Sequence, residues 1–364
     1  MNTTTVGVDL AKYTFSVCEV DSHGRVQLRR DFRRDAFAAW LAQLPPGTVV
    51  AMEACSGAHH WGRRCVDLGL QPRLIAAQFV TPFRKSQRSK NDRNDAEAIA
   101  TAARQGNMRF VAIKSVDQQA RLSWHRVREG YKDENLKVMN RIRGLLAEFG
   151  IVVAKSEIAL RRAFADILER QDLPREFVEL LQDLREHWQQ IQARRQQCNQ
   201  RIETHAQADE RCCRIRAQSG IGPITSDAVV ASVGDGSDFK HGRQMAAWVG
   251  LVPRQDSTGG HQRLGPISRS GDAYLRTLLI QGARSSVLQA SRVPVDKATP
   301  EQIWINQLAT RLPFGKLLVA VANKHARQIW AMLARGEAYD PNAWIRHPMT
   351  QRNASRKNPA AMAA

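Results

Sequence analysis

The chain has 364 residues, 43% of them hydrophobic, which is enough for two or three domains with buried cores. Its 54 Lys and Arg residues outnumber 35 Asp and Glu residues, and the resulting net charge of +19 favours a polyanionic partner. No apolar run approaches the roughly 20 residues of a membrane span, and the start "MNTTTVGVDL" lacks signal-peptide features, so we expect a cytoplasmic protein with no membrane partner.

The first segment, residues 1–112, is predicted to be an α/β domain. Alternating apolar residues and short turns predict a meander of three antiparallel strands, followed by mixed helices and strands. The predicted elements are strands at 4–11, 14–21, 26–32, 48–55 and 72–77, a helix at 34–44, and an Ala- and Glu-rich helix that follows Asp92 and ends at Gly106. Cysteines occur without C-x-x-C or zinc-like spacing, so buried thiols are expected.

The second segment, residues 113–206, is predicted to be a helical linker domain. Apolar residues recur at helical spacing, and two long helices joined around Pro174 predict a hairpin or coiled coil. Basic residues crowd the first helix, and we predict nucleic-acid contacts at Arg126, Lys132 and Arg141. A solvated spacer is the alternative interpretation.

The third segment, residues 207–338, is predicted to be mainly helical. Gly220 and Gly222 form a tight turn that resembles a helix-hairpin-helix, whose backbone N–H groups could bind a phosphate, although many helix pairs use glycine turns. A loop rich in Gly, Ser, Thr and Arg follows, and then two amphipathic helices near 272–289 and 313–335. The basic tail, residues 339–364, is predicted to be disordered.

The strip from Arg84 to Asp95 combines five positive residues with two acids. Its predicted phosphate contacts are Arg84, Lys85, Arg88 and Lys90. Asp92 and Asp95 are spaced i, i+3, which on a helix places their Cβ atoms roughly 5–6 Å apart. Two such carboxylates repel each other. Asp92 as a helix N-cap explains one of them but leaves the second unexplained.

Two predicted strands add one acid each. Alternation places Gly7 and Asp9 on one face of the first strand, and Ala51 and Glu53 on one face of the fourth. A lone acid at a strand end is usually a turn or cap residue. Four carboxylates at one site would instead suit Mg²⁺ or Mn²⁺, and two such ions about 4 Å apart can clamp the oxygens of a phosphodiester.

The motifs "GVDLAK" (7–12), "AMEAC" (51–55) and "KNDRNDAEAIA" (90–100) resemble the RuvC-like, ribonuclease-H-fold domain of DEDD transposases. The resemblance is to the insertion-sequence 110 family, and within it to the 1111 branch. It implies that Asp9, Glu53, Asp92 and Asp95 are metal ligands and catalytic residues. It also implies that the first and fourth strands are neighbours and that the acidic helix packs over them.

The stretch "GLVPRQDSTGGHQRLGPISRSGD" (250–272) carries the second resemblance, to the C-terminal serine transposase domain of that family. The flanking motifs place the family's nucleophilic serine at Ser257, and Thr258 is a second hydroxyl in the same loop. Arg254 and Arg263 are predicted to bring a phosphate close. An ordinary flexible polar loop is the alternative reading from the residues alone.

The resemblance further implies strand exchange on donor and target DNA through a 5′-phosphoserine intermediate. The site would be shared between protomers, with dimers assembling to tetramers in a bacterial, nucleoid-associated protein. An element-encoded noncoding RNA would choose both DNA partners by pairing. The alternatives are a metal-dependent, Holliday-junction-type nuclease that uses water, in which Ser257 is only a loop residue, and a non-catalytic nucleic-acid-binding protein.

Overall fold

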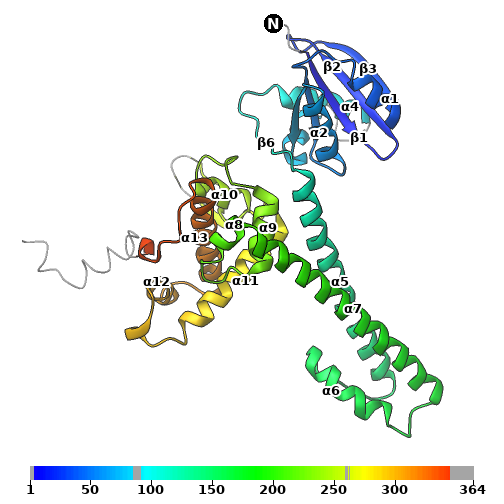
Figure 1. Cartoon of the computed structure of the whole chain (residues 1–364), viewed down its shortest axis with the longest axis vertical. Coiled ribbons are helices and arrows are strands. Elements are labelled where there is room, and N and C mark those ends of the chain that lie inside the picture. The colour runs from blue at the N-terminus through cyan, green and yellow to red at the C-terminus, as the bar shows by residue number, and fades with distance from the viewer. Residues whose placement is uncertain (1–3, 85–91, 259–260, 262, 345–364) are drawn as a thin grey trace, which may run out of the picture. The chain divides into compact units, whose positions relative to one another are not determined.

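The computed structural model describes residues 4–84, 92–258, 261 and 263–344, without the side chains of Asp92, Asn342 and Ala343. It divides into two compact units, Met1–Val116 and Asp117–Ala364. The first unit is a mixed α/β unit built on a sheet, and the second is mostly helical (Figure 1). The predicted combination of α/β and all-α parts is therefore confirmed.

The first unit is built on a six-stranded sheet in the order β3-β2-β1-β4-β5-β6. The strands are β1 (Thr5–Leu10), β2 (Thr14–Val20), β3 (Val26–Arg33), β4 (Val49–Glu53), β5 (Gln71–Ile75) and β6 (Phe110–Val111). The first three strands pair antiparallel, as the meander predicted, whereas β1, β4 and β5 run parallel. β1 and β4 therefore lie at the centre of the sheet as neighbours.

Helices cover both faces of this sheet. On one face, α1 (Arg34–Leu41) and α2 (Ala58–Asp67) bury an apolar cluster with Val6 and Val8 of β1. The opposite face carries α4 (Asp92–Ala103), which packs along β1 and β2. Residues 77–83 form the short α3 (Ala77–Val80) and the 3-10 turn η1 (Thr81–Phe83).

The second unit begins with a helical segment, α5 (Val116–Glu148), α6 (Glu157–Leu168) and α7 (Arg175–Ala208). The two predicted long helices are present, and their shared apolar cluster includes Ile142, Leu181 and Trp188. The connection between these helices, residues 149–174, contains the further helix α6, and Pro174 is the N-cap of α7. Ser156 begins α6 by accepting a hydrogen bond from the Ala159 amide.

The remainder of the second unit packs around one large apolar core. Its helices are α8 (Glu210–Ile215), α9 (Pro223–Val233), α10 (Gly242–Trp248), α11 (Ala273–Ala290), α12 (Pro300–Ala309) and α13 (Phe314–Ala334), with the 3-10 turns η2 (Val295–Lys297) and η3 (Pro341–Trp344). Two details differ from prediction. The Ser/Gly-rich loop contains a hairpin, β7 (Pro253–Gln255) and β8 (Leu264–Ile267). The predicted disordered tail starts with η3, whose Trp344 side chain is fully buried, while residues 345–364 lie outside the described part.

Within the described residues, no helix is long and apolar enough to cross a membrane.

Replacement of Gly7 by alanine should separate α4 from the sheet. A Cβ atom at Gly7 would lie 2.1 Å from the Ala96 carbonyl oxygen and 2.6 Å from the Ala100 amide nitrogen, both backbone atoms of α4. Overpacking of this kind costs about 1–3 kcal/mol or more. We expect faster hydrogen exchange along α4 and a lower melting temperature. Gly106→Ala is the control, because no atom lies within 4 Å of its added Cβ; equal effects of the two substitutions would contradict the close-packing argument.

Candidate functional site

Asp9 and Glu53 end neighbouring parallel strands. The register of the two strands pairs Gly7 with Ala51 and Val8 with Met52, and one further step along both strands sets Asp9 opposite Glu53. Alternation places both carboxylates on the face that α4 covers. The structure thus brings together two acids that are 44 positions apart in the sequence.

Arg84 connects Glu53 to Asp95. Its Nε atom lies 3.0 Å from Asp95 Oδ1, and its Nη2 atom lies 3.7 Å from Glu53 Oε2. Asp95 is 6% exposed on α4, so its charge is partly shielded from water and depends on such a partner. Arg84 therefore neutralises two of the predicted ligands.

The pKa of the Cys55 thiol is affected by carboxylates of the same group. Burial raises its pKa, and the nearby negative charges of Glu53 and Asp9 raise it further. Its Sγ atom lies 4.0 Å from the Leu10 carbonyl oxygen, at the end of β1. The negative charges of Glu53 and Asp9 therefore both influence Cys55, close to the ends of the central strands β1 and β4.

The donor atoms fit a hard divalent cation. Carboxylate oxygens are the ligands that Mg²⁺ and Mn²⁺ prefer. Among the described side chains, no three His, Cys, Asp or Glu residues are grouped so as to hold a metal ion. The side chain of Asp92 lies outside that set, as do Lys85, Arg88 and Lys90 of the predicted basic strip.

A second polar contact, which the sequence analysis missed, holds the start of α4. Across the sheet, Asp9 pairs with Ser16, and Ser16 pairs with Asp31. Ser16 Oγ donates to Asp31 Oδ1 at 2.8 Å, while the Arg93 guanidinium donates to Asp31 Oδ2 from Nε at 3.0 Å and from Nη2 at 2.7 Å. We call the contacts that join Ser16, Asp31 and Arg93 the brace. Because Arg93 lies between Asp92 and Asp95, the brace fixes the helical turn that carries both acids.

The brace is ionic at neutral pH. Hydrogen bonds from Arg93 first, and then from Ser16, lower the pKa of Asp31. Each of its members looks like an ordinary surface polar residue in the sequence. One signal was available, since the apolar residues Val26, Leu28 and Phe32 of β3 place Asp31 on the opposite face of that strand.

Ser257 lies on the exposed side of the β7–β8 hairpin. Its Oγ atom accepts hydrogen bonds from Gln255 Nε2 at 3.1 Å and from the Arg263 amide at 3.4 Å. Arg254, in β7, and Arg263, immediately before β8, are both exposed. Among the described residues, no hydrogen bond joins the His261 side chain to Ser257, so no local base for the hydroxyl is formed within this part of the hairpin.

The base of this hairpin is fixed by close backbone contacts. A Cβ atom at Gly271 would lie 1.8 Å from the Trp248 carbonyl oxygen, and one at Gly250 would lie 2.3 Å from the Ser270 carbonyl oxygen. Both glycines have positive φ, 73° and 82°. Arg276 Nη1 donates to the carbonyl groups of Val249 at 2.9 Å and Ser270 at 3.0 Å. The exposed serine is therefore carried on an anchored support.

The other residues predicted to contact nucleic acid differ in their exposure and in their partners. Arg126, Lys132 and Arg141 are exposed on α5, and Lys132 pairs with Glu129 at 2.8 Å. The Gly220 turn has a packing reason for its glycine, because an added Cβ would lie 2.2 Å from the Gly282 carbonyl oxygen of α11. Phosphate binding at Gly220 and Gly222 stays a prediction.

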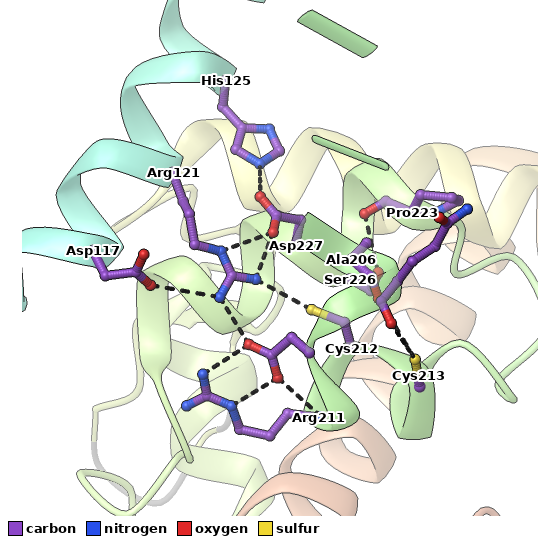
Figure 2. Close-up of polar contacts among 12 residues, drawn as sticks. Asp117, Arg121, His125, Ala206, Arg211, Cys212, Cys213, Pro223, Ser226 and Asp227 are labelled. Carbon is purple, nitrogen blue, oxygen red and sulfur yellow. Dashed lines mark hydrogen bonds and ion pairs between the residues drawn. The ribbon is translucent and has the colours of Figure 1, made fainter. Parts of the chain in front are cut away.

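A buried polar network connects α5 to the helices that carry the hairpin. Figure 2 shows Arg121 and His125 of α5 pointing at Asp227 of α9. Arg121 Nη2 lies 2.5 Å from Asp227 Oδ1, and its Nη1 lies 2.8 Å from Asp209 Oδ2. His125 Nε2 lies 2.8 Å from Asp227 Oδ2.

The same network continues to the end of the serine segment. His125 Nδ1 lies 2.9 Å from the Tyr274 hydroxyl, and Tyr274 is the second residue of α11, two positions after the helix cap Asp272. Burial on its own raises the pKa of Asp227, but the His125 and Arg121 contacts outweigh it and lower that pKa. The charged network therefore positions α11, and with it the base of the hairpin.

Comparison with known proteins gives consistent matches over both units. Residues 212–298 match the model described as the transposase IS116/IS110/IS902 family, and residues 6–151 match a transposase model of the DEDD IS110 type. A probable family 20 transposase of Pseudomonas aeruginosa is 45% identical, covering 94% of this chain and 100% of the relative. The transposase for insertion sequence element IS1111A of Coxiella burnetii is 38% identical, covering 92% and 90%. That for IS1328 of Yersinia enterocolitica is 37% identical, covering 93% and 99%.

Substitution Asp31→Asn should loosen the first turn of α4. At neutral pH we expect faster hydrogen exchange there and a small loss of stability, up to about 1 kcal/mol, because the pair is exposed. The folded pKa is depressed, so the contribution is present above the ordinary carboxyl pKa of about 4 and is lost as the pH falls through the depressed value. The difference from the parent protein should therefore vanish in acid.

Asp35→Asn is the matched control for this prediction, because Asp35 is an exposed acid on α1. Hydrogen exchange of α4 should be unchanged in it. The brace would be refuted by an Asp31→Asn protein whose α4 exchanges no faster than that of the Asp35→Asn protein.

Proposed function

The chain belongs to the IS116/IS110/IS902 transposase family, whose members cut and rejoin DNA, and from this premise we propose that it exchanges DNA strands through a metal-assisted serine nucleophile. The observation that carries the proposal is Ser257, an exposed hydroxyl on an anchored hairpin and flanked by Arg254 and Arg263. The order of the six strands supports a ribonuclease-H-like, RuvC-type first unit.

The carboxylates of Asp9, Glu53, Asp92 and Asp95 would hold Mg²⁺ or Mn²⁺. When bound, the metal would polarise the scissile phosphate and favour loss of the serine proton. Arg84 would give up part of its contact with Glu53 and Asp95 as the metal takes over their charge. The brace from Asp31 to Arg93 would hold Asp92 and Asp95 in place.

Ser257 would act as the nucleophile. Its oxygen forms a bond to phosphorus, the bond from phosphorus to the 3′ oxygen breaks, and a 5′-phosphoserine results. In rejoining, a 3′ hydroxyl attacks the same phosphorus, the bond to Ser257 breaks, and the hydroxyl is restored. Because one phosphodiester is replaced by another, no external energy source is required.

The acids and the serine lie in different compact units. We propose that the complete site forms between the first unit of one protomer and the serine hairpin of another, in dimers that assemble to tetramers. This accounts for the lack of a base hydrogen-bonded to Ser257 in the described part of the hairpin, since the activating group would come from the partner subunit.

A noncoding RNA of the element would select target and donor DNA by base pairing. The support is the spread of positive charge, since a net charge of +19 exceeds what one duplex contact requires. Exposed Arg126, Lys132 and Arg141 on α5 provide backbone contacts of this kind. A metal-dependent nuclease that uses water, such as a junction resolvase, is the second candidate. The four carboxylates would favour it if Ser257 took no part in the reaction.

Ser257→Ala should abolish a covalent protein–DNA adduct. The measurement is a denaturing gel of the protein, end-labelled DNA, Mg²⁺ and co-purified RNA, in which the parent protein gives a labelled band. We expect the band to disappear in Ser257→Ala and in Asp9→Asn. Thr258→Ala is the matched control and should retain it.

Strand cleavage without any adduct, undiminished in Ser257→Ala, would favour the water-using nuclease instead. Loss of the band in Thr258→Ala, with its retention in Ser257→Ala, would move the nucleophile to Thr258.

Removal of RNA should eliminate target choice while leaving general DNA affinity. We expect ribonuclease treatment to abolish sequence-specific recombination, because backbone contacts carry no sequence information. The measurement compares cognate and scrambled DNA before and after treatment, with added transcript as the rescue. Sequence-specific activity that persists without RNA would refute RNA guidance.

A further inference from the structure

Three cationic side chains gather where α10 meets α13, and the sequence analysis had singled out none of them. Arg243 belongs to α10, and Lys324 and Arg327 lie three positions apart on α13, so they share one face of that helix. The two helices approach closely here, because a Cβ atom at Gly242 would lie 2.8 Å from the Arg327 carbonyl oxygen. We call Arg243, Lys324 and Arg327 the α10–α13 cationic cluster.

No acid forms an ion pair with this cluster in the part of the chain that the structure describes. Among the described residues, none of the three takes part in an ion pair, in contrast to the arginines of the first unit. Arg327 has a buried Nε atom with no hydrogen-bond partner, a state that costs free energy unless a ligand satisfies it. The Lys324 ammonium group lies over the ring of Trp344, 5.2 Å from its centroid.

The charges of the cluster oppose one another. Burial first, and then the charge of Arg327, lower the pKa of Lys324 to about 8. Burial and the charge of Arg243 likewise lower the pKa of Arg327. Like charges gathered in a partly desolvated place are unfavourable, and a bound anion would remove that cost.

The cluster adjoins the base of the serine hairpin. Asn323, next to Lys324, donates from Nδ2 to the Leu251 carbonyl oxygen at 3.2 Å, and Leu251 lies two residues before β7. Arg243 is exposed, and Lys324 and Arg327 are partly exposed, so all three can be reached from solvent.

We propose that the α10–α13 cationic cluster binds the phosphodiester backbone of a polynucleotide beside the serine hairpin. An anion there would pair with Lys324 and Arg243 and satisfy the unpartnered Arg327 nitrogen. A polynucleotide fits better than a small anion, because several cations without acid partners match a repeated phosphate charge. This proposal rests on nucleic-acid binding by the transposase family, and it is independent of the chemistry proposed for Ser257.

The test measures binding of the full chain in the Ser257→Ala background, with chelator in place of Mg²⁺, so that cleavage plays no part. Lys324→Met keeps the apolar stem and removes the charge. With a fluorescent DNA duplex, loss of one phosphate contact should reduce the slope of log affinity against log salt by about 0.9. That corresponds to roughly eightfold weaker binding at 0.1 M salt if the lines meet at 1 M.

Lys316→Met is the matched control, an exposed lysine on the same helix, and its salt slope should stay near that of the parent. Arg243→Gln, an exposed position that does not endanger folding, should reproduce the Lys324→Met result. A parallel titration with a folded RNA shows which polynucleotide the cluster binds. The slope of log affinity against log salt should fall in the variants only for the nucleic acid, DNA or RNA, that contacts the cluster.

Protein stability supplies the second readout. Because the cations repel one another, Lys324→Met should leave the melting temperature of the nucleic-acid-free protein unchanged or raise it. Reduced slopes with unimpaired stability support the site. If the salt slopes of Lys324→Met equal those of Lys316→Met with both DNA and RNA, the proposed phosphate site is wrong. This conclusion would hold whatever the outcome of the adduct experiment on Ser257.

Discussion

The close approach of α4 to β1 is the constraint on which the acidic site depends. Gly7 lacks a side chain, so the backbone of α4 at Ala96 and Ala100 lies against the strand. Asp95 precedes Ala96, and Asp9 follows Gly7 by two residues. A larger residue at position 7 would push the helix outward and move its acids away from those of the strands, so one missing Cβ sets the spacing of the whole group.

Charge compensation divides the molecule into two kinds of polar site. In the first unit, arginines pair with the acids, with Arg84 beside Glu53 and Asp95, and Arg93 beside Asp31. Each guanidinium offsets the negative charge of the carboxylates that it contacts. The α10–α13 cationic cluster is the opposite case, because its cations have no acid partners among the described residues. The first arrangement is suited to a cation, and the second to an anion.

Several elements with a continuous sequence pattern could be predicted from the sequence, and several others could not. The meander, β4, β5, α4 and the two long helices each carry a continuous pattern of apolar residues or helix formers. The helices α2, α6, α10 and α12 and the β7–β8 hairpin are short, and several of them are held mainly by contacts with distant segments. The hairpin is the clearest case, since its strands are largely exposed and its base is fixed by Gly250, Gly271 and Arg276.

By itself, the sequence determined which residues can carry the chemistry and which face of each strand or helix they occupy, because side-chain type and local periodicity are properties of short stretches. Asp9, Glu53 and Asp95 were singled out in this way, whereas Ser257 was placed by the resemblance of its flanking motifs to the family. Only the tertiary structure decided which of them meet. The β1–β4 register, the contacts of Arg84 with Glu53 and of Arg93 with Asp31, and the approach of Arg243 to Arg327 join residues tens of positions apart. Such contacts depend on packing that no local pattern encodes.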